Sequence, residues 1–344
     1  MIFWHELKKI LSSVALWCFI ALCIIFNLWN IPSHLNNRID TTIPFPTNVF
    51  ATYDTSRIAE AYISAFGLTG NIAERMRAKY TALQRVVDEN ALAGYSFSPY
   101  LGYYTANMRL HLFSTFGVIG ILTLQGMLLA VLLALLAIGY EQINHTEHSV
   151  YVTKTGRKIL HYKIFVSLMA SIGLYVLLTA ITLIAYFSVL NFSGVWGSSV
   201  SSGFNYSVDI FAGVRPFTTW RNFTVASYWL ASLGLSLVLV ICFSLMGVIA
   251  GILLRSSYIG FLMVMVINAV LMISPLIFLP NSYIHYISNH LPLGLLRNSL
   301  WWFTDGGFIT LWRNFESWGA GLSLLFLSTL CVLSIVKFRK KDVA

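Results

Sequence analysis

Six apolar segments, each about as long as a bilayer is thick, constrain the fold of this chain more than any other feature. About 20 apolar residues cross the hydrocarbon core of a membrane as an α-helix. Spanning helices are predicted at Ile10–Ile31, Phe116–Ile138, Ile164–Leu190, Tyr228–Leu254, Tyr258–Leu279 and Trp318–Val336. Only 10% of the 344 residues are charged, whereas a soluble protein carries about 25%. We therefore predict an all-α membrane protein with six transmembrane helices.

The first span, and the boundary between the fourth and fifth, allow a second interpretation. The run Ile10–Ile31 lies where a signal peptide would lie. It is, however, longer than the roughly 7–15 residues of a signal core, and no Ala-x-Ala-like cleavage site follows it. Only Arg255–Ser257 separates the fourth span from the fifth, so a chain with five spans is the alternative.

The distribution of Lys and Arg predicts the orientation of the spans. With the N-terminus inside, the four inside segments hold eleven Lys and Arg residues, and the two shorter outside loops hold four. Short loops rich in Lys and Arg stay in the cytoplasm. We therefore expect both termini in the cytoplasm. Membrane orientation also accounts for the formal charge of +9, so nucleic acid is not an expected partner.

Residues 32–112, between the first two spans, predict a small helical extracellular domain. The stretch NIAERMRAKYTALQRVVDEN places apolar side chains on one helix face: Ile72, Met76, Tyr80, Leu83 and Val87. A shorter helix is predicted over Ser56–Phe66. The domain then lies between a first membrane part, residues 1–31, and a second, residues 113–344. It either packs on the outer mouth as a scaffold or gates cargo and binds a partner.

Tryptophan gathers near the predicted outer boundary of the spans, at Trp29, Trp196, Trp220, Trp229, Trp301, Trp302, Trp312 and Trp318. An aromatic belt at headgroup level is one interpretation. The other is that Leu291–Phe303 forms a short helix in the outer leaflet that steers an amphipathic cargo outward. Trp301 and Trp302 would then lie on the cargo path.

Gln125 and Asn268 are polar residues in the middle of spans. They predict either hydrogen bonds between helices or contacts along a cargo path. The spans carry essentially no charged residue between their ends, so a proton-driven pump has no candidate group. Asp305 beside Gly306-Gly307 is the one position that suggests a lipid-modifying enzyme, and we interpret it as a turn.

The chain lacks the motifs of the common catalytic and metal sites. It has no phosphate-binding loop and no Gly-x-Ser-x-Gly. The sequence HTEH, with His145 and His148, lacks the spacing of a zinc hydrolase and is better explained as a solvated polar helix. No Cys/His ligand spacing appears. We expect no metal, no cofactor and no catalysis in this chain.

A polar insert, YEQINHTEHSVYVTKTGRKILHYK, separates the second span from the third. Glu141 lies five residues before Thr146, Arg157 lies eleven after it, and Lys163 lies six after Arg157. This pattern resembles the loop of ABC-2-type exporter permeases, in which a Glu, a Gly-Thr pair, an Arg and a Lys follow at similar spacing. The chain departs from that pattern in three ways: His145 replaces the Gly, a Pro is missing, and the Lys comes one residue early.

The two ends of the chain extend the resemblance. FWHELKKIL resembles the amphipathic helix before the first span of this family, with Phe3, Trp4 and Leu7 in the interface. Its charged residues, Glu6, Lys8 and Lys9, are expected to face water. The ending VKFRKKDVA resembles the C-terminal end that is usual in this family. The large first external loop matches some branches of the family, among them transporters that export peptides or confer immunity to them. The arrangement of spans and loops resembles the family over nearly the whole chain, whereas the sequence motifs cover only about 35 residues.

The resemblance implies a function. Loop 140–163 would hold a coupling helix that docks on a separate ATPase subunit. The expected contacts are Glu141, Gln142, His145, Thr146, His148 and Arg157. ATP and Mg²⁺ would bind to that partner, and a second permease chain, identical or paralogous, would complete the exporter in the bacterial cytoplasmic membrane. The expected cargo is an amphipathic or hydrophobic molecule such as an antimicrobial peptide. The alternatives are an exporter of a drug or lipid-linked glycan, and a membrane-embedded sensor or immunity protein without transport.

Overall fold

The structure is a computed structural model that describes residues 2–33, 49–94, 117–144, 146, 158–189, 196–254 and 256–340. Within these residues six helices are long and apolar enough to cross a membrane. They are α2 (Val14–Ser33), α6 (Gly117–Ile143), α8 (Ile159–Val189), α9 (Val225–Leu253), α10 (Ser257–Ile277) and α13 (Phe315–Lys340). The predicted all-α membrane fold is confirmed, with six such helices rather than five.

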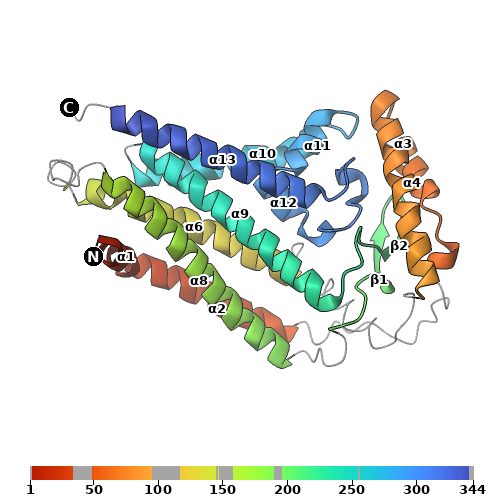
Figure 1. Ribbon diagram of the computed structural model, residues 1–344, viewed down its shortest axis with the longest axis horizontal. Helices are drawn as coiled ribbons and strands as arrows, with labels where there is room; N and C mark the ends of the chain where they lie inside the picture. The colour runs from red at the N-terminus through yellow and green to blue at the C-terminus, as the bar shows by residue number, and fades with distance from the viewer. Residues whose placement is uncertain are drawn as a thin grey trace.

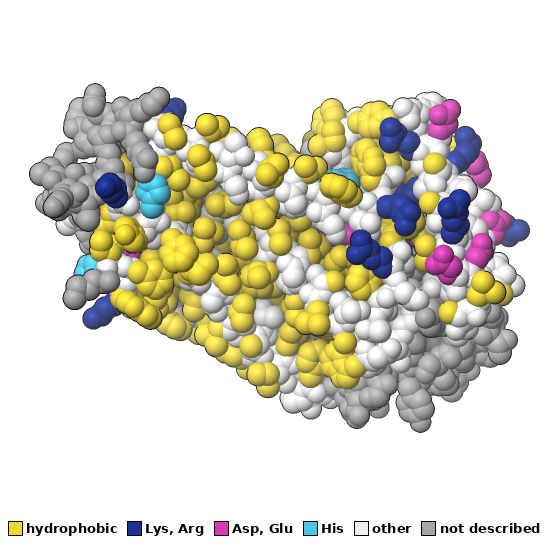
Figure 2. All heavy atoms as spheres, in the orientation of Figure 1, with side chains coloured by type: hydrophobic (Ala, Val, Ile, Leu, Met, Phe, Trp, Pro, Cys, Tyr) yellow, Lys and Arg dark blue, Asp and Glu magenta, His cyan; other side chains and the backbone are white. Residues whose placement is uncertain are grey.

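The spanning helices lie side by side and give the molecule two different ends (Figure 1). The N-terminus, the end of α6, the start of α8 and the end of α13 lie at one end, which we call the termini end. The other, the domain end, carries the helices and strands outside the bundle. Figure 2 shows hydrophobic side chains gathered over the spans between these ends, and charged side chains gathered toward the ends.

Helix α6 forms the centre of the bundle. In its most apolar stretch 78% of the residues are buried, against 22% for α10 and 28% for both α2 and α13. Glycine allows α9 to approach it closely. A Cβ atom on Gly247 would lie 2.8 Å from the Cβ of Ala134, and one on Gly251 would lie 3.0 Å from the Cβ of Ile138. The Gly-x-x-x-Gly pattern of α9 therefore packs within the chain.

The first span begins later than the sequence predicts. A separate helix, α1 (Ile2–Leu11), ends at a break over Ser12 and Ser13, and α2 begins at Val14. Ile10, predicted as the first residue of the span, is instead a buried residue of α1. The indole of Trp17 donates to the carbonyl oxygen of Leu11 over 2.7 Å and closes this elbow.

The domain end contains the two predicted helices, α3 (Ser56–Phe66) and α4 (Gly70–Leu92). A short 3₁₀ turn, η2 (Val49–Thr52), precedes them. All five residues of the predicted apolar face of α4 are buried. Four of them, all except Val87, share a core with Trp220, Tyr286 and Leu311, which come from later segments of the chain. The packing unit is thus larger than the loop 32–112 alone.

A β-hairpin that the sequence analysis missed packs beside these helices. It consists of β1 (Ser202–Asp209) and β2 (Gly213–Phe217), which pair antiparallel with Ser207 opposite Arg215 and Asp209 opposite Gly213. The positive φ of 75° at Gly213 suits a glycine after the turn. The hairpin brings Arg215 and Asp209 toward α3.

The connection from α10 to α13 folds back into the bundle. It contains α11 (Tyr283–Asn289), α12 (Pro292–Arg297) and the 3₁₀ turns η4 (Ser299–Trp301) and η5 (Gly307–Ile309). Helix α12 packs against α6, α10 and α13. The buried side chain of Asn289 organises this connection, because it donates to the carbonyl oxygens of His285 and Ile309 and accepts from Arg297 and Asn298.

Candidate functional site

Four charged residues form a buried network at the termini end, which we call the termini-end cluster: Glu6, Lys9, Glu141 and Lys163. The Lys9 ammonium lies 2.6 Å from Glu6 and 3.1 Å from Glu141. Lys163 pairs with the same Glu141 carboxylate and donates to the carbonyl oxygen of Ala137 over 2.9 Å. The two acids balance the two lysines, and the network joins α1, α6 and α8.

The cluster changes the interpretation of two predicted site residues. Glu6 was expected to face water, but its side chain is 3% exposed and ion-paired, so that expectation is wrong. Glu141 is 2% exposed and lies inside the chain rather than on its surface. Of the other predicted coupling residues, Gln142 is half-buried and Thr146 is exposed. His145, His148 and Arg157 lie outside the described residues.

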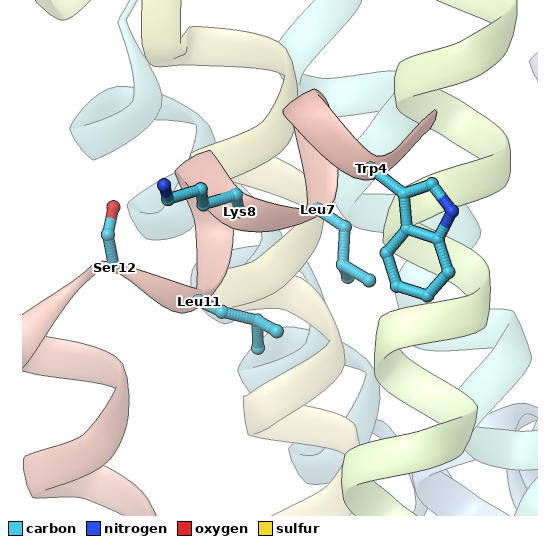
Figure 3. A pocket seen from close by; sticks show the side chains of 5 residues that line it. All are labelled: Trp4, Leu7, Lys8, Leu11 and Ser12. Atoms are coloured by element: carbon cyan, nitrogen blue, oxygen red, sulfur yellow. The ribbon is translucent and has the colours of Figure 1, made fainter. Parts of the chain in front are cut away.

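Helix α1 is amphipathic, as the sequence predicts. Phe3 contacts the ring of Phe165 on α8 with 5.9 Å between centroids. Trp4 is 70% exposed, and Lys8 is exposed as well. An open groove runs along the helix, lined by Trp4, Leu7, Lys8, Leu11 and Ser12 (Figure 3).

Gln125 lies in a hydrogen-bonded pair in the middle of the bundle. Its amide nitrogen donates to Asn27 over 2.8 Å, and Asn27 donates back to Gln125 over 2.9 Å and to Thr182 over 3.0 Å. Asn268 donates over 2.8 Å to the carbonyl oxygen of Val264 on its own helix. Both amides are buried. For Gln125 the structure favours the interpretation as a bond between helices over a contact with cargo.

A seam of buried hydroxyl groups runs along one face of α8, and the sequence analysis missed it. Its members are Ser167, Ser171, Tyr175, Thr179, Thr182 and Tyr186. On the facing helices, Ser236 lies within hydrogen-bond distance of both Tyr175 and Thr123. The signal was present, because these residues recur every three or four positions along a single helix face.

Trp302 and Trp301 lie in the connection from α10 to α13. Trp302 is 1% exposed, and its indole donates to the carbonyl oxygen of Leu295 over 2.9 Å. Trp301 is half-buried, and the guanidinium of Arg215 lies 5.9 Å from its ring centroid. Trp302 is therefore a packing residue and does not belong to an aromatic belt at the lipid surface.

A second buried network, the domain-end cluster, ties α3 and α4 to the loops of the bundle. It comprises Tyr62, Lys79, Tyr80, Asp209, Arg215 and Asp305. Arg215 and Asp305 form an ion pair at 2.5 Å, and both are 3% exposed. Tyr80 donates to Asp305 over 2.7 Å. Arg215 donates to the hydroxyl of Tyr62 over 2.9 Å, and that hydroxyl donates in turn to Asp209.

Lys79 fixes the loop that precedes α13. Its ammonium donates to the carbonyl oxygens of Asp305, Gly307 and Thr310 over 3.2, 2.5 and 2.8 Å. These are as many acceptors as a lysine ammonium has donors. The turn that the sequence predicts at Asp305 therefore exists, with positive φ at Gly306 and Gly307. Its carboxylate, however, is part of an ionic network rather than exposed.

The electrostatics of the domain-end cluster follow from burial and close opposite charges. Burial lowers the pKa of Lys79 to about 7, although the Asp305 charge opposes the shift. Burial alone would raise the pKa of Asp305, but Arg215 and Lys79 outweigh it and hold that pKa below its ordinary value. Burial raises the pKa of Tyr80 well above its ordinary value, so its hydroxyl stays a hydrogen-bond donor.

Comparisons of the chain with protein families, with curated proteins and with solved structures find no match. The functional argument therefore rests on the residues of this chain and their geometry.

Proposed function

We propose that this chain is the membrane subunit of an ATP-driven exporter of the ABC-2 type. The observation that carries the proposal is the termini-end cluster. Glu141 closes the base of the loop between α6 and α8, since it pairs with Lys163 across the two helices and with Lys9 on α1. A force applied to this loop by a partner would therefore reach three helices at once.

The position of α6 explains how such a force would act on the whole bundle. It packs against α2, α8, α9 and α10, and its interior is the most buried of the six spans. A partner that moves the end of α6 thus moves the element around which the other helices pack. Two-state rearrangements of this kind are the usual way in which a local push changes a membrane bundle.

The partners and cargo follow from the same proposal. An ATPase subunit would hold ATP and Mg²⁺ and contact the loop at the half-buried Gln142 and the exposed Thr146, with His145, His148 and Arg157 nearby in sequence. In this arrangement Glu141 positions the loop and does not touch the ATPase. A second permease chain and lipid would cover the outward sides of α2, α10 and α13. The apolar spans suit an amphipathic peptide cargo.

A cross-linking experiment tests this proposal. A photo-crosslinker at Gln142 or Thr146, in membranes that also contain the cognate ATPase, is expected to capture that ATPase from the cytoplasmic side. A crosslinker at Arg57 on α3, which is exposed at the domain end, is the matched control and should not capture it. The proposal fails if Thr146 is labelled only from outside the cell, or if the purified chain alone hydrolyses ATP.

One observation favours a sensor as the second candidate. The domain-end cluster fixes α3 and α4 to loops that continue into α9 and α13, so a ligand bound outside would act directly on the bundle. A sensor of this kind would change conformation with its ligand in the absence of any ATPase. Exposure of Thr146 to a thiol reagent, measured in a Thr146→Cys variant with and without ATPase, separates the two functions.

A further inference from the structure

Lys8 differs from the other two charged residues of α1. Glu6 and Lys9 are neutralised within the termini-end cluster. Lys8 is exposed, and no carboxylate among the described residues contacts it. Within the described part of the chain, helix α1 therefore presents to its surroundings one positive charge that no carboxylate neutralises.

This charge lies at the edge of the apolar groove. Trp4, Leu7 and Leu11 point to the same side of α1, while Lys8 and Ser12 stand at the groove's edge (Figure 3). Residues three or four positions apart lie on the same side of a helix, and these five residues follow that spacing. The charged group and the apolar surface are thus adjacent but separate, as they are in a lipid molecule.

The elbow between α1 and α2 determines the level in the bilayer at which the groove lies. The membrane span begins at Val14, only two residues after Ser12. A helix joined so closely to the start of a span lies at the level of the lipid headgroups, with its apolar face toward the acyl chains. The bond from Trp17 to the Leu11 carbonyl oxygen holds α1 in that position.

We propose that this groove binds an anionic phospholipid of the surrounding bilayer. The phosphate lies at Lys8, and an acyl chain lies against Trp4, Leu7 and Leu11. An anionic lipid fits because the described lining of the groove offers a cation and no acid, so a zwitterionic headgroup would find no partner there for its own positive charge. The proposal does not depend on the exporter function.

The bound lipid would also stabilise the termini-end cluster. One side of α1 carries the groove, and its other side holds Glu6, Lys9 and the buried Ile10 against the bundle. A lipid that fills the groove presses the helix onto Glu141. Its loss would leave α1 held by the ionic contacts and a few apolar ones. Anionic lipid is thus a structural ligand of the base of the α6–α8 loop.

The experiment measures lipid retention and thermal stability of the full chain. The wild type is purified in mild detergent, supplied with phosphatidylglycerol or phosphatidylcholine, and analysed by native mass spectrometry and thermal unfolding. We expect phosphatidylglycerol to be retained and to raise the Tm, and phosphatidylcholine to do neither. In Lys8→Gln the affinity for phosphatidylglycerol should fall about tenfold, which is the loss of one charge-assisted contact.

Two further variants make the result decisive. Lys337→Gln removes an exposed lysine from α13 at the same end and should retain lipid like the wild type. Trp4→Ala removes apolar lining and should weaken retention without changing the preference for a negative headgroup. Equal retention of phosphatidylglycerol by Lys8→Gln and by Lys337→Gln would overturn the proposal. Equal stabilisation of the wild type by both lipids would overturn it as well.

Discussion

The two buried charge clusters of this protein are built from different side chains. At the termini end, two lysines meet two carboxylates, and one main-chain carbonyl oxygen also accepts from Lys163. At the domain end, an arginine, tyrosine hydroxyls and three main-chain carbonyl oxygens surround Asp305 and Lys79. Lysine is a point charge on a flexible stem, whereas arginine binds through a rigid planar fork. The termini-end ion pairs, which are all made by lysines, can therefore exchange partners, whereas the Arg215–Asp305 pair at the domain end holds one geometry.

This contrast matches the positions of the clusters in the molecule. The termini-end cluster lies at the base of the loop that we propose as the contact for a partner. The domain-end cluster fastens helices α3 and α4 to loops that enter α9 and α13. A molecule with one adaptable end and one fixed end can change shape at the first while the second keeps its structure.

The largest effect is expected from breaking the fixed end. Asp305→Asn removes the nearer of the two carboxylates that pair with the buried guanidinium of Arg215 and leaves Asp209 at 3.7 Å. Breaking such a buried pair costs about 3–5 kcal/mol. Thermal or chemical unfolding of the detergent-solubilised chain measures it. The double variant Arg215→Met with Asp305→Leu should recover part of this loss, because the buried guanidinium is removed together with its nearer partner. A double variant as unstable as the sum of the two single ones would contradict the pairing.

A smaller effect is expected at the adaptable end. Glu141→Gln leaves Lys9 and Lys163 without that carboxylate, but their long stems allow the ammonium groups to turn toward lipid headgroups. We expect a loss of about 1–3 kcal/mol. A cysteine at Ile10 should become more reactive to thiol reagents in the variant as α1 loosens. An unchanged reaction rate there, with normal folding, would show that Glu141 does not hold α1.

The smallest and most selective effect is expected when pH changes the free energy of unfolding through Lys79, at the domain end. Lys79 has a folded pKa of about 7 and an ordinary value of 10.5. Between these values the unfolded chain binds a proton that the folded chain does not, so the free energy of unfolding rises with pH. Asp305 titrates below this window, and Arg215 titrates above it.

The Tm should therefore increase from about pH 7 to about pH 9. Lys79→Met, which cannot titrate, should make that slope shallower, and Lys337→Gln, which removes an exposed lysine, should keep it. Scanning fluorimetry across this range measures all three proteins. The assignment is wrong if Lys79→Met shows the full slope of the wild type.

The sequence predicted those parts of the structure that depend on local pattern. The membrane spans could be predicted from the length of the apolar runs. The predicted apolar face of α4, from Ile72 to Val87, is buried. Both predictions use signals that neighbouring residues contain. The hairpin also left a local signal, the alternation of Phe204, Tyr206 and Val208 with polar residues. It was overlooked because the apolar spans dominate that part of the chain.

The clusters could not be predicted in the same way. Glu6 carries the pattern of a surface residue on an amphipathic helix, but it is buried and paired with Lys9, which also pairs with Glu141 far along the chain. Asp305 has the sequence surroundings of a turn, and its ionic role depends on Arg215 and Lys79 from two other segments. Contacts between such distant segments leave no periodicity, so one sequence does not reveal them.

The contacts of Lys79 also govern how the chain reaches its final structure during synthesis. Its acceptors at Asp305 and Thr310 follow it by 226 and 231 residues. A ribosome that adds about 5–20 residues per second needs roughly 10–50 s to cover that distance. During this delay the amine that later becomes buried stays hydrated, and α4 cannot close against its final neighbours. Truncation before Asp305 removes these acceptors and should thus leave α3 and α4 open to proteases, even though their own residues are complete.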